Sequence, residues 1–204
     1  MRPLVEGLQA AGHTVQAPTL PGHGTVAEAL ETVGWAEWIA AAHEWPADVI
    51  IGQSMGASLA LALAAQGGCR AVVAINPPVP GPDAVEGLEW RQSRGHDWVD
   101  GPPLAHGEVG YARLPTVALL AMTNGVLATD LQLVRCPVLL VTGALDEVVD
   151  PAGADLIASG LGGPVTRVTL RNSGHVATLG PDLQELLATV AEFIGERQTD
   201  RAQW

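Results

Sequence analysis

Residues 49–65 read VIIGQSMGASLALALAA, and this stretch decides how the rest of the chain is interpreted. An apolar, β-branched run opens it, the pattern G-x-S-x-G follows at residues 52–56, and strong helix formers complete it. Strand, tight turn and helix form the context in which a serine hydroxyl is projected from the end of a sheet. We therefore expect a strained backbone at Ser54 and a need for glycine at both flanking positions, Gly52 and Gly56.

The composition indicates one folded domain, because 48% of the 204 residues are hydrophobic and only 16% are charged. The formal net charge of −12 argues against nucleic acid as a partner, since phosphate binding needs clustered lysine and arginine. No apolar run is long enough to cross a bilayer, and the N-terminus lacks the continuous apolar core of a secretory signal. We expect no membrane anchor and a cytoplasmic location.

The two cysteines, Cys69 and Cys136, each precede a predicted strand. We expect reduced, buried thiols that could be neighbours, and no disulfide framework. Histidine, cysteine and carboxylate side chains do not cluster at metal-ligand spacings, and no G-x-G-x-x-G follows a strand. We therefore expect no metal and no cofactor.

Strand-like and helix-like segments alternate, which is typical of an α/β fold with a mostly parallel sheet flanked by helices. The predicted strands are Thr14–Ala17, Asp48–Ile51, Ala71–Ile75, Pro137–Val141 and Val165–Leu170. The predicted helices are Leu4–Ala11, Trp35–Glu44, Met55–Ala65, Ala152–Ser159 and Leu183–Gly195. We treat residues 1–204 as a single domain.

The alternation breaks where residues 77 to about 115 become rich in Pro, Gly, His and Asp and show no clear period. This composition predicts an irregular insertion, of the kind that often serves as a lid or substrate wall. Val117–Leu133 is predicted to be helical, with an interruption near Asn124-Gly125.

A serine hydroxyl needs a base at neutral pH, and His175 is the best placed of the six histidines. It follows the last predicted strand, which puts it at the same edge of a parallel sheet as Ser54. The others are His13 at the opposite edge, His43 on a helix, His23 in a tight loop that it shapes, and His96 and His106 in the insertion, where they remain competitors.

The base needs a carboxylate that fixes its tautomer, and Asp146, a few residues past a predicted strand, is well placed for this. Glu147 would point elsewhere, and Asp150 resembles a helix cap because proline follows it. The chain order Ser54, Asp146, His175 is the order found in α/β-hydrolases.

With these residues in place, the chain resembles the small bacterial carboxylesterases and monoacylglycerol lipases of the α/β-hydrolase superfamily. The matching stretches are Pro21-Gly22-His23-Gly24, Gly52-Gln53-Ser54-Met55-Gly56, residues 136–151 around Asp146, and Ser173-Gly174-His175-Val176-Ala177-Thr178-Leu179. The resemblance implies a small-molecule substrate: a short- or medium-chain carboxylic ester or a monoacylglycerol, cleaved through an acyl-serine intermediate. It also implies that residues 77–130 form a small cap. Side chains that could then line the acyl pocket are Trp90, Trp98, Leu119, Met122 and Val126, although core packing is the alternative for each.

The resemblance also implies a segment that this chain does not match. In the family, a preceding strand ends in a His-Gly loop that supplies one N–H of the oxyanion hole, and Met1 here aligns with the helix after that loop. The N–H of Met55 supplies the other donor, and the unmatched one is typically worth ~10²–10³ in rate. The unmatched strand would leave a gap of about 9–10 Å between the strands at residues 14–17 and 48–51.

Three explanations of this gap are open. The sequence is a fragment or has a misassigned start, which we favour; the two flanking strands pair directly in a smaller sheet; or the chain is a degenerate relative that binds without catalysing. Other functions also stay open: an acyltransferase, thioesterase or amidase on the same triad, or a truncated, non-catalytic α/β-hydrolase-fold binding protein.

Overall fold

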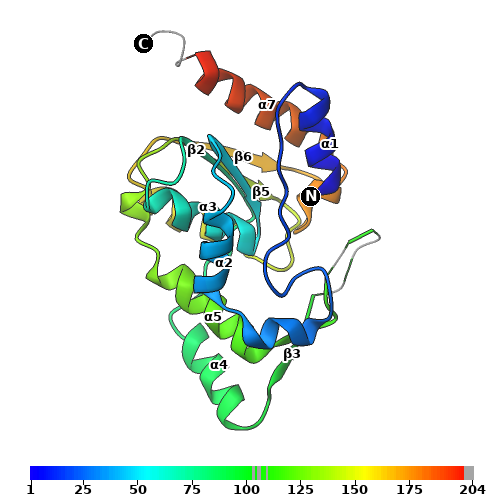
Figure 1. Cartoon of the computed structure of the whole chain (residues 1–204), viewed down its shortest axis with the longest axis vertical. Coiled ribbons are helices and arrows are strands. Elements are labelled where there is room, and N and C mark those ends of the chain that lie inside the picture. Colours follow the sequence, from blue (N-terminus) through cyan, green and yellow to red (C-terminus); the bar gives the residue numbers. More distant parts are fainter. Residues whose placement is uncertain (103, 105–106, 109, 200–204) are drawn as a thin grey trace.

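The computed structural model describes residues 1–102, 104, 107–108 and 110–199 and is built on a parallel sheet (Figure 1). Its strands are β1 (Val49–Gln53), β2 (Ala71–Ile75), β5 (Val138–Gly143) and β6 (Val165–Leu170), in the order β1-β2-β5-β6. The register pairs Gln53 with Ile75, Ile75 with Val141, and Gly143 with Leu170, so the strands end along one edge. The predicted α/β class and all but one of the predicted strands are confirmed.

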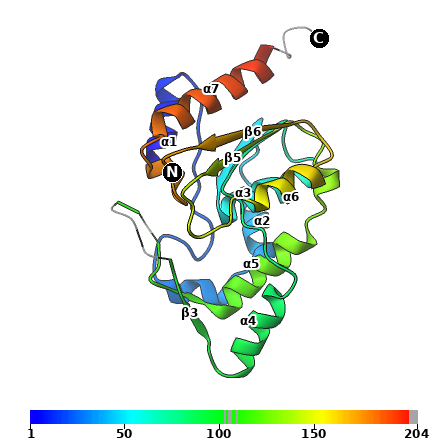
Figure 2. The ribbon, with the colours of Figure 1, turned by 180° about the vertical axis from the view of Figure 1, so that it is seen from behind.

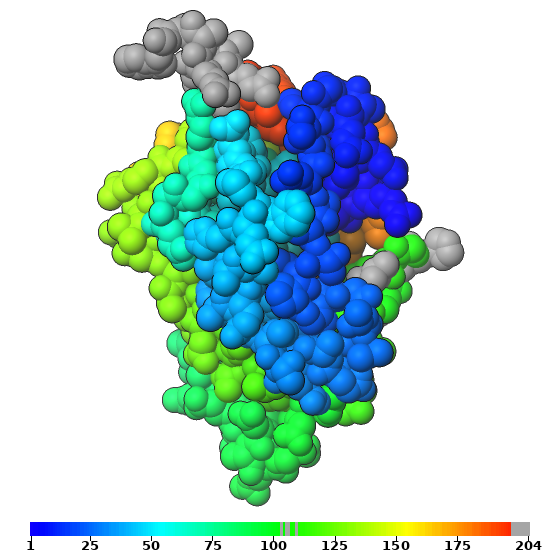
Figure 3. Space-filling view, viewed as in Figure 1, coloured from blue at the N-terminus to red at the C-terminus, as the bar shows by residue number. Residues whose placement is uncertain are grey.

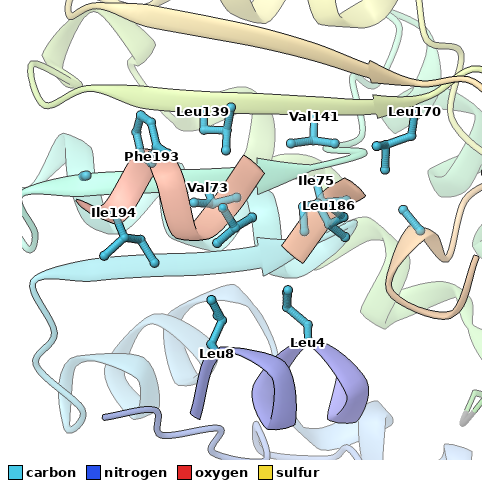
Figure 4. Close-up of a cluster of buried hydrophobic side chains, with 13 residues drawn as sticks. Leu4, Leu8, Val73, Ile75, Leu139, Val141, Leu170, Leu186, Phe193 and Ile194 are labelled. Carbon is cyan, nitrogen blue, oxygen red and sulfur yellow. The ribbon is translucent and has the colours of Figure 1, made fainter. Parts of the chain in front are cut away.

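Two helices, α1 (Arg2–Ala10) and α7 (Leu183–Thr199), cover one face of this sheet. Figure 4 shows Leu4 and Leu8 of α1, with Phe193 of α7, gathered against the side chains of β2 and β5. The strand residues in this cluster alternate, as Val73 and Ile75 do on β2, while Val72 and Ala74 face the opposite side. Both faces of the central strands are thus apolar, as expected for a parallel sheet with helices on both sides.

The other face is covered by α3 (Met55–Ala65) and α6 (Gly153–Gly160), which Figure 2 shows from behind. Every residue from 57 to 64 of α3 is buried, so this helix has no polar face and needs neighbours all round. The strands β1 and β2 lie on one side of it, and α2 (Trp35–His43) and α5 (Thr116–Ala128) complete the cover. The sequence prediction of α3 had the same bounds as the structure.

The insertion between β2 and β5 is more regular than predicted. It contains α4 (Ala84–Ser93), the antiparallel pair β3 (Trp98–Asp100) and β4 (Arg113–Pro115), and α5. Figure 3 shows it, in green, as the narrow lower end of the molecule. The irregular segment predicted for this region is wrong at α4. No residue of α4 is buried, so its sequence carries no apolar period from which a helix could be recognised.

The predicted strand Thr14–Ala17 is wrong. Residues 13–20 have no regular secondary structure and pair with no strand of the described chain, although Val15 packs against the core between α1 and α7. A β-prone stretch without a neighbouring strand cannot complete a ladder of backbone hydrogen bonds, so local propensity is overridden. Direct pairing of this stretch with β1, one of the three explanations above, is therefore wrong as well.

The predicted interruption near Asn124-Gly125 is also wrong, because α5 runs unbroken through both residues. Gly125 has a packing role: a Cβ atom built there would overlap the indole ring of Trp35. The glycine thus lets α2 and α5 approach each other, which accounts for a residue that otherwise weakens a helix.

Short 3₁₀ helices lie at Ala27–Thr32 (η1), Leu131–Leu133 (η2) and Ala177–Leu179 (η3). Among the described residues, no helix combines the length and the apolar character needed to span a membrane.

Cys69 and Cys136 are free thiols and are neighbours at the amino ends of β2 and β5. Both are half-buried, whereas the sequence predicted buried side chains. A hydrogen bond from Cys69 stabilises the Cys136 thiolate and lowers the pKa of Cys136 to about 7. The pKa of Cys69 is raised, because its hydrogen bond to Cys136, its burial and the negative charge on the Cys136 sulfur all favour the protonated thiol.

Replacing Gly125 tests its packing role. We expect Gly125→Ala to lower the free energy of unfolding by about 1–3 kcal/mol, because the Trp35 ring must move to admit a methyl group. The matched control is Gly87→Ala in α4, where a Cβ meets nothing within 4 Å. The control should gain up to about 1 kcal/mol from helix propensity. Urea unfolding of both variants measures the difference, and equal effects would contradict this role.

Candidate active site

The turn between β1 and α3 presents Ser54 at the carboxyl edge of the sheet. Ser54 has a left-handed backbone, with φ 55° and ψ −125°, and its N–H donates to the carbonyl of Ile75 at 2.8 Å. The predicted strain at this position is confirmed. A Cβ on Gly52 would overlap the carbonyl oxygen of Gly56, so the requirement for glycine is confirmed there. It is wrong for Gly56 itself, where a Cβ would meet nothing within 4 Å.

Three loops at this edge bring Ser54, His175 and Asp146 into hydrogen-bond contact. The Ser54 Oγ atom lies 2.9 Å from His175 Nε2, and His175 Nδ1 lies 2.9 Å from Asp146 Oδ2 and 3.2 Å from Oδ1. Their side chains are largely shielded from solvent, with exposed fractions of 14% for His175 and 2% for Asp146. The residues come from the ends of β1, β5 and β6, the positions that the sequence predicted for them.

This contact order defines what the imidazole can do. A carboxylate accepts hydrogen bonds, so Asp146 retains the proton of His175 on Nδ1 and leaves the Nε2 lone pair free to accept from the Ser54 hydroxyl. Asp146 is itself held, because its Oδ1 accepts from the backbone N–H groups of Val148 and Val149, each at 2.9 Å. The group is therefore a continuous hydrogen-bonded chain from a fixed acceptor to the serine oxygen.

Neighbouring acids and histidines take other places. Glu147 is exposed. Asp150 is not the helix cap that its sequence context predicts, because the residue directly before α6 is Ala152, which has no side-chain cap. Asp150 Oδ1 instead accepts from the N–H of Ala152 at 2.9 Å, in the turn that precedes the helix. His23 packs edge-on against Trp38, with ring centroids 5.8 Å apart, and contacts the carbonyl of Pro21. The other assignments are His43 beside Gln66, His96 beside Trp90, and His106 outside the described residues.

The His175 loop is held by two side chains that sequence reasoning missed. Gln53 Oε1 accepts from the N–H of Thr178 at 3.2 Å. Asp182, only 8% exposed, accepts from the N–H and side-chain amide of Asn172 at 2.7 and 2.9 Å, and from Ser173 Oγ at 3.1 Å. Hydrogen bonds, first from Asn172 and then from Ser173, hold the pKa of Asp182 below its usual value. An Asp directly before a predicted helix was the available sequence signal.

The N–H of Met55 is the first of α3, one of the backbone donors that a helix start leaves without an intrahelical partner. The positive end of the helix dipole favours negative charge at this point. The half-buried Met55 side chain, like Met122 of α5, packs against the buried apolar cluster formed by Leu30, Trp38, Leu59 and Ala118.

The five predicted substrate-wall residues do not form one wall. Trp90 is 57% exposed on α4, and Trp98 on β3 lies beneath the guanidinium of Arg113, 5.6 Å from its ring centroid. The other three residues lie on α5. Leu119 is half-buried, and Met122 packs against the same apolar cluster as Met55. Val126 lines a cavity of about 210 Å³ between α3, α5 and α6.

Within the described residues, no group of three or more His, Cys, Asp or Glu side chains could hold a metal ion.

The chain belongs to the alpha/beta hydrolase family, whose model matches residues 1–188. It is similar to the thermostable monoacylglycerol lipase of Bacillus sp. (strain H-257), with 33% identity over an aligned length of 215 residues. The alignment covers 96% of this chain and 85% of the relative. A solved structure from work on LipS and LipT, two metagenome-derived lipolytic enzymes, is 30% identical and has a TM-score of 0.85, covering 96% of this chain and 87% of the other. The Paleococcus ferrophilus monoacylglycerol lipase shares the fold, with 17% identity and a TM-score of 0.69, over 93% and 86% of the two chains.

The two glycines around the serine provide a matched pair of variants. We expect Gly52→Ala to cost about 3 kcal/mol or more in the free energy of unfolding, because the clash is with main chain that cannot rotate away. Gly56→Ala should leave stability unchanged or improve it by up to about 1 kcal/mol. Thermal unfolding measures both, and a Gly52→Ala variant as stable as Gly56→Ala would contradict the steric argument.

The support of the His175 loop by Asp182 predicts a pH-dependent stability. Folding lowers the pKa of Asp182, so its contribution is complete above about pH 4 and is lost as the pH falls through the lowered folded-state value. Asp182→Asn should therefore reduce Tm at pH 7, and the gap to the parent protein should narrow steadily below about pH 4. A gap that is independent of pH would show that the charge of the carboxylate is unimportant.

Proposed function

We propose that the protein is a serine hydrolase that cleaves carboxylic esters through an acyl-serine intermediate, with Ser54 as nucleophile, His175 as general base and Asp146 as the residue that orients the base. The observation that carries the proposal is the continuous hydrogen-bond chain from Asp146 through His175 to Ser54. Membership of the alpha/beta hydrolase family and similarity to lipolytic enzymes support a carboxylic ester hydrolase.

The reaction follows from the contacts. As Ser54 Oγ bonds to the ester carbonyl carbon, its proton moves to His175 Nε2, and the imidazolium formed is stabilised by Asp146. The carbonyl oxygen becomes an oxyanion, which the N–H of Met55 stabilises at the start of α3. Collapse breaks the bond to the alcohol, which takes the proton from Nε2, and a water molecule then releases the acid from Ser54 by the same steps.

We propose short- or medium-chain acyl esters or monoacylglycerols as the substrate class, with residues 77–130 as a cap over the acyl chain. The similarity to the Bacillus monoacylglycerol lipase supports this class. The cap is supported by the apolar cluster of Leu30, Trp38, Leu59 and Ala118, because Met55 of the nucleophile turn and Met122 of α5 both pack against it. Of the five wall residues, Met122 is the one that we propose to contact the acyl chain first.

Labelling of Ser54 tests the proposal. A fluorescent organophosphonate should react with one equivalent of the parent protein, and Ser54→Ala should lose both the label and ester turnover, by about 10⁵-fold in kcat. The matched control is Ser58→Ala, one helical turn away, which should be labelled like the parent. Turnover of a medium-chain monoacylglycerol that persists in Ser54→Ala would refute the serine mechanism, and labelling without ester turnover would refute the substrate class.

A further inference from the structure

Asn76, the residue directly after β2, has a conformation that few side chains tolerate. Its φ is 46°, and only 2% of its surface is exposed. Asparagine is one of the few residues with a side chain that enter this left-handed region readily. Its N–H donates to the carbonyl of Val141 on β5 at 2.9 Å, so the main chain of Asn76 is still tied to the sheet while its side chain turns toward the catalytic edge.

The side-chain amide of Asn76 joins two loops. Its Oδ1 accepts from the N–H of Gly143, the last residue of β5, at 2.8 Å. Its Nδ2 donates to the carbonyls of His175 and Gly174 at 2.8 and 3.2 Å. Both N–H groups of the amide are therefore in use, and a buried amide that is fully bonded in this way has one orientation.

The two arms end beside the acid and the base. The carbonyl of Gly143 accepts from the N–H of Asp146 at 3.2 Å. The Oδ1 atom of Asn76 is therefore linked to the Asp146 loop through one residue, Gly143. The Nδ2 arm ends on the carbonyl of the base residue itself. A single planar amide group thus connects the end of β5, which leads to Asp146, with the His175 loop.

We propose that Asn76 is a positioning residue that sets the distance between Asp146 and His175. The inference rests on the proposed triad but adds a residue that touches neither substrate nor the reacting atoms. Asparagine suits this position because one arm must accept and the other must donate, which neither aspartate nor a hydroxyl side chain offers with the same reach. Displacement of a catalytic group by about 1 Å can cost 10²-fold in rate, so a loose span should affect turnover directly.

The test separates positioning from simple stabilisation. Asn76→Asp keeps the shape and the acceptor for Gly143 but removes the donors to the His175 loop, and Asn76→Gly removes both arms while tolerating the positive φ. The control for lost stability is Val190→Ala, a fully buried core position on α7 that should lose about 1–3 kcal/mol by cavity formation. All are assayed below their Tm, together with Ser54→Ala.

We expect kcat to fall about 10- to 100-fold in Asn76→Asp and at least as far in Asn76→Gly, with KM changed by less than about twofold. The low-field proton NMR signal of the His175–Asp146 hydrogen bond should shift or broaden in both variants. Val190→Ala should keep the parent kcat and the parent signal.

The inference is overturned if folded Asn76→Asp retains both kcat and the low-field signal, or if Val190→Ala loses as much kcat at equal stability. Should Asn76→Gly fail to fold, the isosteric Asn76→Asp decides the question alone. Activity that survives in Ser54→Ala would instead remove the proposed triad, which is a different outcome from a failure of Asn76.

Discussion

The close approach of the main chain at Gly52 to the carbonyl of Gly56 is the constraint on which the rest of the molecule depends. It forces the chain from β1 into α3 within a single residue, and Ser54 accepts a left-handed backbone as a result. Such strain costs of order 1–3 kcal/mol and persists only where the surroundings enforce it. The surroundings here are α3, buried over residues 57–64, and the bond from Ser54 to Ile75. The apolar core is therefore what holds the serine in place.

A second layer of polar contacts converts three strand ends into one site. Parallel strands deliver their loops to the same edge, but loops alone do not fix angstrom-scale distances. Asp146 is held by the backbone N–H groups of Val148 and Val149 in its own loop, and the His175 loop is held by Asp182 and by Gln53 at the end of β1. Of these supporting side chains, Asp182 is buried and Gln53 is half-buried.

The sequence predicted most of the strands and helices and the place of the site, and the wrong or missing predictions share one cause. The strand, turn and helix around Ser54 have strong local signals, and the order of Ser54, Asp146 and His175 predicted where they meet. Thr14–Ala17 has the local signal of a strand but no partner in the described chain, and Gly125 has the local signal of a helix break but serves Trp35. Asn76 directly follows the predicted strand Ala71–Ile75, and its neighbours in sequence do not indicate the two loops that its side chain joins. In each case a contact distant in sequence decides, and composition does not encode it.

The insertion leaves the sheet after β2 and returns at β5, and these two strands are neighbours with Ile75 beside Val141. Pairing of β2 with β5 therefore fixes the two ends of the insertion but sets neither its length nor its sequence. By contrast, the short connections after β5 and β6 carry Asp146 and His175, whose side chains meet at 2.9 Å, so an added residue there would alter this contact. The insertion can therefore change in length or content without moving the strand ends that carry Ser54, Asp146 and His175.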